Sequence, residues 1–319
     1  MHGVFLDAAS VDRGDLDLTR LRETLESWAI HDSTTPDRLA GRIAEADVIV
    51  TNKVRLGEEE MALAPRLRLV ALTATGYNNI DLEAARRRGV AVSNIRAYCT
   101  PSVVQHTFAL ILALRTRMDD YRRLVREGGW ARAEQFCPLD FTIHELHGET
   151  LGIIGHGELG RAVAAVGRAF GMEVVTARRP GRTAAEDPRP DLDELLPHLD
   201  VLTLHLPLTP ENHHLINRRR LERLPEGALL INTARGALVD EAALADALRA
   251  GHLGGAGIDV LSEEPPRHGN PLLADDIPNL IVTPHVAWAA VEARQRAIDQ
   301  VADNIRNFLE GRPCNRVDV

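Results

Sequence analysis

The sequence predicts an α/β protein with parallel sheets, because short β-branched runs alternate with amphipathic helical stretches throughout its 319 residues. That length is about twice the length of a typical domain, so two domains are expected. A content of 45% hydrophobic and 26% charged residues is typical of a soluble globular protein. Together these observations favour two α/β domains.

The first hundred residues predict strands at Gly3–Asp7, Asp47–Thr51, Leu67–Thr73 and Val90–Val92. Amphipathic patterns between these strands predict helices at Leu18–Trp28, Pro36–Ala44 and Leu82–Arg88. A long helix is then predicted from Pro101, which suits a first helical position, to Glu127, since Gly128 and Gly129 would end it. Residues 128–147 are expected to be irregular.

The second half of the chain repeats the alternation of strands and helices. Its apolar runs predict strands at Thr150–Ile154, Glu173–Ala177, Val201–His205, Ala228–Asn232, Gly257–Val260 and Leu280–Thr283. Helices are predicted at Glu158–Phe170, Arg218–Leu224, Glu241–Ala250 and, closing the chain, Trp288–Glu310. Residues 180–190 are rich in Pro, Arg and Glu, which predicts a surface loop.

The composition excludes several classes of function. A formal net charge of -9 argues against a nucleic-acid-binding protein, whose footprint would be a basic patch. The three cysteines, Cys99, Cys137 and Cys314, have no ligand-like spacing, so neither a metal site nor a disulfide framework is expected. The N-terminal segment lacks the apolar core of a signal peptide, and the longest apolar run, Phe108–Leu114, is too short to span a membrane. We therefore expect a cytoplasmic protein with no membrane partner.

A GxGxxG motif, formed by Gly155, Gly157 and Gly160, follows one predicted strand and precedes a predicted helix. In such a unit the first glycine permits a tight turn and the second lets backbone amides approach a pyrophosphate. The third glycine lets the helix pack close to the sheet, with its positive end toward the phosphates. This context predicts dinucleotide binding; the alternative is a tight turn without a ligand.

The residues after the next strand bear on the choice of cofactor. A carboxylate at that position would bind the ribose 2′-hydroxyl of NAD, whereas an arginine would suit the 2′-phosphate of NADP. The chain has Arg178 and Arg179 there and no carboxylate, which favours NADP(H) over NAD(H). The alternative is a solvated basic turn in an arginine-rich protein.

Three later strands end in polar residues whose types suit one reaction. The carboxyl ends of parallel strands line the binding crevice, so Arg235, Glu264 and His285 are expected to converge there. A guanidinium binds a carboxylate through a bidentate fork, and a protonated imidazole can neutralise charge that develops on a carbonyl oxygen. A carboxylate on the other ring nitrogen favours the protonated imidazole. Individually, the three could be a surface turn, a loop charge and a satisfied core histidine.

Over essentially its whole length the sequence resembles the D-isomer-specific 2-hydroxyacid dehydrogenases. The resemblance rests on the GxGxxG motif and, in order, on residues 205–209, 232–236, 259–266 and 283–285. Residues 51–54, 74–81, 105–107 and 285–288 are most similar to the glycerate dehydrogenase and hydroxypyruvate (glyoxylate) reductase branch. This resemblance implies an oxidoreductase that transfers a hydride between NAD(P)H and a small anionic 2-oxo acid, converting hydroxypyruvate or glyoxylate to D-glycerate or glycolate.

The same resemblance implies two Rossmann-like domains with parallel sheets. Residues 1–98 and 286–319 would form a discontinuous, flavodoxin-like substrate domain, and residues 99–285 would form the dinucleotide-binding domain. It also implies a homodimer formed through the cofactor domain, with the helix from Pro101 and the arm after it buried against the partner. Gln105 stands where the family commonly has Glu, and Arg178 where NAD-using members usually have Asp.

The resemblance also implies roles for individual residues. Arg235 would anchor the substrate, His285 would donate and accept the proton, and Glu264 would be the partner of His285. Asp259 would hold the nicotinamide carboxamide. The residues expected at the cofactor are Gly155, His156, Gly157, Glu158, Leu159, Gly160, Arg178, Arg179, His205, Pro207, Thr233, Ala234, Arg235, Asp259 and His285. Those expected at the substrate are Lys53, Thr75, Gly76, Arg235, His285 and Trp288, with Thr75 and Gly76 offering backbone amides to the carboxylate.

Lys53 is the only lysine in the chain, and it follows a predicted strand end. Its ammonium is expected beside the substrate carboxylate or a terminal hydroxyl; the alternative is a chance survivor of an arginine-biased composition. Two other functions are compatible with the whole pattern. One is another D-2-hydroxyacid dehydrogenase of the family, although formate dehydrogenases carry Gln where Glu264 stands. The other is a dinucleotide-sensing, corepressor-like binding protein.

Overall fold

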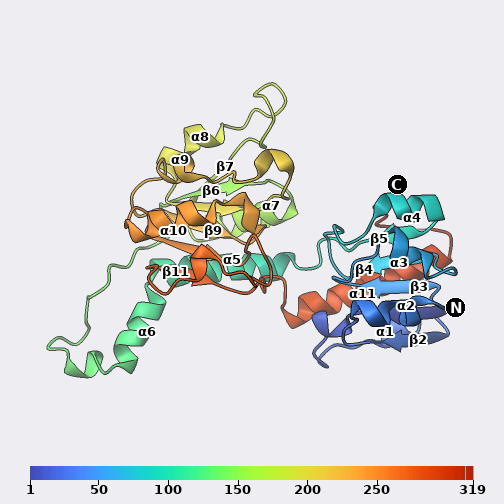
Figure 1. Cartoon of the computed structure of the whole chain (residues 1–319). Helices are drawn as coiled ribbons and strands as arrows, with labels where there is room; N and C mark the ends of the chain where they lie inside the picture. The colour runs from blue at the N-terminus through green and yellow to red at the C-terminus, as the bar shows by residue number, and fades with distance from the viewer. Residues whose placement is uncertain (313, 319) are drawn as a thin grey trace. The chain divides into compact units, whose positions relative to one another are not determined.

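The computed structural model describes residues 1–312 and 314–318 and divides into two compact units (Figure 1). One unit comprises Met1–Cys99 with Trp288–Val319, and the other comprises Thr100–Ala287. Each unit contains one sheet in which every pair of neighbouring strands is parallel. The prediction of two α/β domains with parallel sheets is therefore confirmed. Within the described residues, no helix is both long and apolar enough to cross a bilayer.

The sheet of the first unit has the strand order β2-β1-β3-β4-β5, which is the flavodoxin-like order. Its strands are β1 (His2–Phe5), β2 (Ser27–Ile30), β3 (Val48–Thr51), β4 (Leu69–Leu72) and β5 (Ala91–Ser93). Its helices are α1 (Thr19–Arg22), α2 (Pro36–Ile43), α3 (Glu58–Ala62), α4 (Leu82–Arg88) and α11 (Val291–Leu309). Alternate residues along the strands pack against different helices, so α2, α3 and α4 cover one face while α1 and α11 cover the other.

The predicted helix at Leu18–Trp28 is wrong. Only Thr19–Arg22 is helical, and Ser27–Ile30 forms β2, which pairs with β1 at the edge of the sheet. Trp28 lies over Gly3 of β1, where an added Cβ would come within 2.7 Å of the indole ring. Strand pairing and packing of the indole on a glycine thus outweigh the amphipathic pattern of this segment.

The sheet of the second unit has the order β11-β10-β9-β8-β6-β7. Its strands are β6 (Thr150–Ile154), β7 (Glu173–Thr176), β8 (Val201–Leu204), β9 (Leu229–Asn232), β10 (Gly255–Ile258) and β11 (Leu280–Val282). The chain first builds outward from β6 to β7 and then returns to β8 on the other side of β6. The order therefore reverses at β6, and in open α/β sheets ligands bind outside the strand ends at such a point.

The helices of this unit are α5 (Thr100–Arg115), α6 (Met118–Arg126), α7 (Glu158–Ala169), α8 (Leu192–Leu195), α9 (Arg218–Leu221) and α10 (Glu241–Arg249). The chain also forms short 3₁₀ helices at Ala8–Ser10, Trp130–Arg132, Leu196–His198, Pro210–Asn212, Gly236–Leu238 and Pro271–Leu273. The single long helix predicted from Pro101 to Glu127 is wrong, because Arg117 adopts a left-handed conformation with φ 52° and separates α5 from α6. Beyond this break, α6 projects away from the sheet of its unit (Figure 1).

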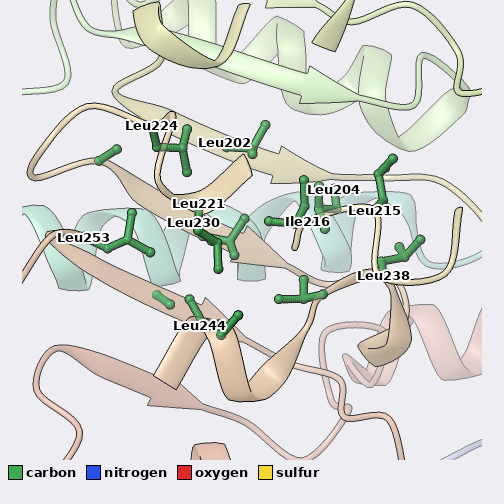
Figure 2. Packing of buried hydrophobic residues seen from close by; sticks show 14 of the residues in the cluster. Leu202, Leu204, Leu215, Ile216, Leu221, Leu224, Leu230, Leu238, Leu244 and Leu253 are labelled. Atoms are coloured by element: carbon green, nitrogen blue, oxygen red, sulfur yellow. The ribbon is translucent and has the colours of Figure 1, made fainter. Parts of the chain in front are cut away.

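Two hydrophobic layers hold this second sheet between its helices. On one face, Leu202 and Leu204 of β8 and Leu230 of β9 pack against leucines of α9 and α10 (Figure 2). On the other face, residues of β6, β8 and β9 pack against α5 and α7. Each fully buried leucine contributes roughly 1.5–3 kcal/mol relative to exposure. The strand ends are thereby held on a rigid base.

Candidate active site

The predicted functional residues of the second unit lie at the carboxyl ends of adjacent strands. Going across the sheet, His285 follows β11, Glu264 follows β10 and Arg235 follows β9. His205 directly follows β8, the glycine motif follows β6, and Arg178 follows β7 after one residue. The sheet order thus brings residues from six separate segments to one edge.

The turn after β6 has the geometry that a dinucleotide requires. Gly155 has φ 99°, and an added Cβ there would lie 2.2 Å from the carbonyl oxygen of His205. A Cβ on Gly160 would lie 1.9 Å from the carbonyl oxygen of Gly155. A Cβ on Gly157, by contrast, would meet no atom within 4 Å, and this residue caps α7 without a side-chain hydrogen bond. Open space beside an uncapped helix N-terminus fits a pyrophosphate.

The other residues of this motif surround the turn. His156 is exposed, and its Nδ1 lies 3.4 Å from the hydroxyl of Thr176. Burial and then the nearby arginines, Arg189 first, lower the pKa of His156. The carboxylate of Glu158 accepts a hydrogen bond of 2.5 Å from Thr100 at the start of α5, and Leu159 is half-buried. The arginines around His156 make the turn electropositive.

The basic turn after β7 uses its two arginines differently. The Nε of Arg178 donates to the carbonyl oxygens of Asp187 and Arg189, both at 3.1 Å, so its guanidinium holds the 187–191 segment. The backbone amide of Arg179 donates to the Asp187 carboxylate, and the Arg179 side chain is exposed. Within the described residues, no hydrogen bond or ion pair of the Arg179 guanidinium is present. Arg179 is thus the better placed of the two to meet an added anion.

The side chain of His205 is turned into the protein. Its Nε2 lies 2.9 Å from the hydroxyl of Thr203, and its backbone amide donates to Ile154 on the neighbouring strand. Burial lowers the pKa of His205 to about 4. Pro207 follows in the same loop, and its carbonyl oxygen accepts from Asn212. His205 therefore contacts the glycine turn through its backbone, while its buried ring packs against Thr203.

His205 should make stability depend on pH. Because its folded pKa lies below the unfolded value, the unfolded chain binds more protons between about pH 6.5 and 4. The contribution of His205 to the free energy of unfolding is then fully present above about pH 6.5. As the pH falls, the free energy of unfolding decreases by up to about 3 kcal/mol. His205→Gln should reduce this slope in urea unfolding at several pH values, while His198→Asn, at an exposed position, should retain it. Equal slopes for His205→Gln and the wild type would contradict the assignment.

Arg235 lies in the loop after β9. Its backbone is extended, its side chain is exposed, and its Nη1 donates to the carbonyl oxygen of Ala234 at 2.6 Å. The half-buried Thr233 lies 3.4 Å, hydroxyl to hydroxyl, from Thr107 of α5. A Cβ on Gly236 would lie 2.0 Å from the backbone of Leu261, so the glycine lets the loops after β9 and β10 pack together.

Glu264 and His285 are joined by a hydrogen bond, with 2.6 Å between Glu264 Oε2 and His285 Nδ1. The other carboxylate oxygen of Glu264 accepts the backbone amide of Leu261 at 2.9 Å. Both side chains are about one-third exposed, at 35% and 33%. A ring held at Nδ1 by a carboxylate presents Nε2 for proton exchange. The expected pairing of these two side chains is thus present in the structure.

Asp259, at the end of β10, has a fully buried carboxylate. It accepts hydrogen bonds from the hydroxyl of Thr283 and from the backbone amides of Val286 and Ala287. Its expected contact with a nicotinamide carboxamide stays a prediction. In the structure, the Asp259 carboxylate contacts the loop that carries His285.

Of the residues expected at the substrate, Lys53, Thr75 and Gly76 follow strands of the first unit, and Trp288 belongs to the same unit. Lys53 is exposed after β3, and its backbone amide donates to the buried carboxylate of Asp7 at 2.7 Å. Thr75, which precedes Gly76 in the loop after β4, donates its hydroxyl to the carbonyl oxygen of Ile95. Trp288 packs edge-on against Tyr98 with 6.4 Å between ring centroids.

Three residues that hold these loops in place were not identified in that role from the sequence. Asp7 holds the Lys53 loop, Asp187 holds the basic turn, and His106 of α5 contacts Thr283 next to the His285 loop. Asp7 ends the first predicted strand, which is the only sequence signal that points to it. Within the described residues, no cluster of three or more His, Cys, Asp or Glu side chains is arranged to hold a metal ion.

Comparisons with known proteins agree with this geometry. Residues 108–287 match the model of the D-isomer specific 2-hydroxyacid dehydrogenase, NAD binding domain. The chain is 42% identical to the glycerate dehydrogenase of Methylorubrum extorquens, over 99% of this chain and 98% of that one. It is 37% identical to the hydroxypyruvate reductase of Blautia hydrogenotrophica, over 99% of each chain. The TT0316 protein of Thermus thermophilus superposes with a TM-score of 0.85 at 38% identity, covering 99% of this chain and all of that one.

Proposed function

The chain belongs to the D-isomer-specific 2-hydroxyacid dehydrogenase family, and on that basis we propose that it reduces hydroxypyruvate and glyoxylate to D-glycerate and glycolate. Oxidoreductase activity between 2-oxo and 2-hydroxy acids follows from the family. The choice of acid rests on the glycerate dehydrogenase and hydroxypyruvate reductase to which the chain is similar throughout its length. The observation that carries the chemistry is the Glu264–His285 pair on neighbouring strand ends.

A bound nicotinamide supplies the hydride, and the residues of the chain supply the proton and the charge. His285 donates its Nε2 proton to the substrate carbonyl oxygen as negative charge develops there. Glu264 stabilises the protonated imidazole through Nδ1 and fixes the direction of the ring. In the oxidative direction the same nitrogen accepts the hydroxyl proton. The Gly157 turn and the N-terminus of α7 would hold the pyrophosphate, and the fully buried Asp259 is assigned no direct step.

Arg235 is the proposed anchor of the substrate carboxylate. Its guanidinium is exposed at the end of β9, the strand next to the one that leads to Glu264. Thr75 and Gly76 of the first unit are proposed to contact the substrate through their backbone amides. Lys53 and Trp288 are proposed to recognise the rest of a three-carbon acid. A cationic anchor is needed because the protein carries a net charge of -9.

A panel of 2-oxo acids tests the proposed substrate. With saturating NAD(P)H, kcat/KM for hydroxypyruvate should exceed that for pyruvate, which lacks only the terminal hydroxyl, by more than about tenfold. Glyoxylate should be reduced, while branched acids such as 2-oxoisocaproate should react slowly. Higher kcat/KM for pyruvate or a branched acid would assign the chain to another activity of the family, and no turnover with any acid would contradict the proposal.

We propose that the cofactor is NADP(H) rather than NAD(H). Arg178 and Arg179 follow β7, where a carboxylate would bind the ribose of NAD. Arg178 braces the loop through two carbonyl oxygens, which leaves the exposed Arg179 guanidinium as the proposed contact to the 2′-phosphate. The arginines near His156 add to the positive charge at this end of the sheet.

Arg179→Ser is expected to lower kcat/KM with NADPH at least tenfold while changing kcat/KM with NADH less than about twofold. The reason is that a charge-assisted contact to the phosphate is lost and NADH has no phosphate to contact. Arg182→Ser is a matched control, since Arg182 lies in the same loop but pairs with Glu186. Steady-state kinetics with both cofactors provide the measurement. A clear preference of the wild type for NADH would refute the assignment.

We also propose a homodimer that forms through the cofactor-binding unit. Phe136 and Leu139 are 89% and 85% exposed, and other exposed apolar residues lie on α6 and in the segment after it: Met118, Val125, Trp130 and Ile143. A cavity of about 460 Å³ lies nearby, lined by α5, α6 and residues 275–281. Apolar side chains at this density mark a protein interface. Light scattering should give twice the 35.0 kDa mass of one chain; the mass of one chain would refute the dimer.

The cytoplasm is the proposed location of the enzyme. NAD(P)H and small 2-oxo acids are both present there, and no helix within the described residues is long and apolar enough to hold the chain in a membrane. Cell fractionation would test this, and activity confined to the secreted or membrane fraction would contradict it.

A further inference from the structure

The backbone of His285 adopts an unusual conformation. Its φ is 54°, in the left-handed region that non-glycine residues rarely occupy. Such a residue persists only where its surroundings hold it in place. Its backbone amide lies 2.7 Å from the carbonyl oxygen of Asp259 and 2.9 Å from that of Thr283. The loop that presents the imidazole therefore depends on contacts from outside the loop.

The Asp259 carboxylate supplies most of these contacts. It accepts the backbone amides of Val286 and Ala287, both at 2.9 Å, and the hydroxyl of Thr283 at 2.5 Å. These donors lie on both sides of His285 in the chain. Because the carboxylate is fully buried, water cannot replace any of these bonds. The direction of the His285 side chain thus depends on where this carboxylate lies.

The hydroxyl of Thr283 connects this hydrogen-bond network to His106 on α5. The hydroxyl of Thr283 has one proton, and its short bond to the carboxylate of Asp259 uses it. The Nε2 of His106 lies 3.0 Å from the same hydroxyl oxygen, so His106 must be the donor in that bond. The same nitrogen lies 3.5 Å from Asp259 Oδ1. His106 therefore holds the oxygen pair from the helix side, with its Nε2 protonated.

We propose that His106 and Thr283 are positioning residues that act through Asp259 to hold His285 against Glu264. The proposal rests on the proposed function, since it concerns the group assigned there to proton transfer. All five residues belong to the unit Thr100–Ala287. Loss of the His106 donor removes one hydrogen bond from the Thr283 hydroxyl that contacts the buried Asp259 carboxylate, and this should loosen the loop. Substitution of His106 or Thr283 should lower kcat and leave KM nearly unchanged. The reason is that neither residue contacts the substrate in this scheme, and His285, which does, is left in place.

Two substitutions of His106 distinguish the effect of losing its N–H donor from the effect of replacing its ring. His106→Leu, which keeps the volume and removes the N–H, should lower kcat for hydroxypyruvate at least tenfold. KM for hydroxypyruvate and for NAD(P)H should stay within about twofold. His106→Gln should restore kcat to within about threefold of the wild type, because its amide N–H can reach the Thr283 oxygen. Gln105→Leu is the matched control, at an exposed position one residue earlier on the same helix, and should behave as the wild type.

Hydrogen–deuterium exchange gives a readout that does not depend on turnover. Peptides that cover residues 283–290 should exchange faster in His106→Leu, and as in the wild type in His106→Gln. Should His106→Leu fail to fold, Thr283→Val makes the same test. If the wild type reduces no 2-oxo acid while exchange still rises in His106→Leu, the network is supported and the proposed function fails.

Two results would overturn the inference. One is unchanged kcat and unchanged exchange in His106→Leu. The other is a raised KM for NAD(P)H with kcat intact, which would assign the cluster to cofactor binding.

Discussion

His285→Ala is expected to slow reduction of the 2-oxo acid by about 10²–10⁴-fold at every pH, because general acid catalysis contributes about that factor. NAD(P)H binding, measured by quenching of protein fluorescence, should change little, since the glycine turn and the basic turn remain intact. Single-turnover rates with saturating substrate give the measurement. A rate within about threefold of the wild type would remove His285 from the chemistry.

Glu264→Gln tests whether the pair acts as one unit. The amide keeps the size of the side chain but cannot stabilise a protonated imidazole as the carboxylate does. The fall in the reductive rate at high pH should therefore move to lower pH in this variant, and kcat should drop. An unchanged pH–rate profile would separate Glu264 from His285 despite the 2.6 Å between them.

Arg235→Lys is expected to lower kcat/KM for hydroxypyruvate by more than about tenfold, which corresponds to about 1.4 kcal/mol of lost transition-state binding. An ammonium on a flexible stem cannot reproduce the planar, bidentate contact of a guanidinium with a carboxylate. Arg218→Lys, in a surface ion pair with Asp246, is the control for a loss of arginine as such. Near wild-type kcat/KM in Arg235→Lys would refute the anchoring role.

The sequence by itself determined the fold class and the segments that carry the chemistry. Alternating apolar runs are local features, and strands such as Val48–Thr51 and Thr150–Ile154 lie where those runs predict them. The glycine motif can also be recognised in the sequence: a Cβ at Gly155 or Gly160 would clash with neighbouring backbone, and the space beside Gly157 is open. Since parallel strands end at one edge of a sheet, the polar residues that follow them can be assigned to a common edge from their order in the chain.

Only the tertiary structure decided what each side chain contacts. Ser27–Ile30 forms a strand because β1 offers it a pairing edge and a glycine beneath Trp28, and neither feature can be read within the segment itself. Arg178 and Arg179 are adjacent residues of the same type, yet the Arg178 guanidinium is hydrogen-bonded to the following loop and the Arg179 side chain is exposed. The position of His106 depends on a hydrogen bond to Thr283, 177 positions along the chain, and the Asp259 carboxylate is bonded to residues that follow a different strand. Such bonds are set by how the strands and α5 pack, which local sequence patterns do not encode.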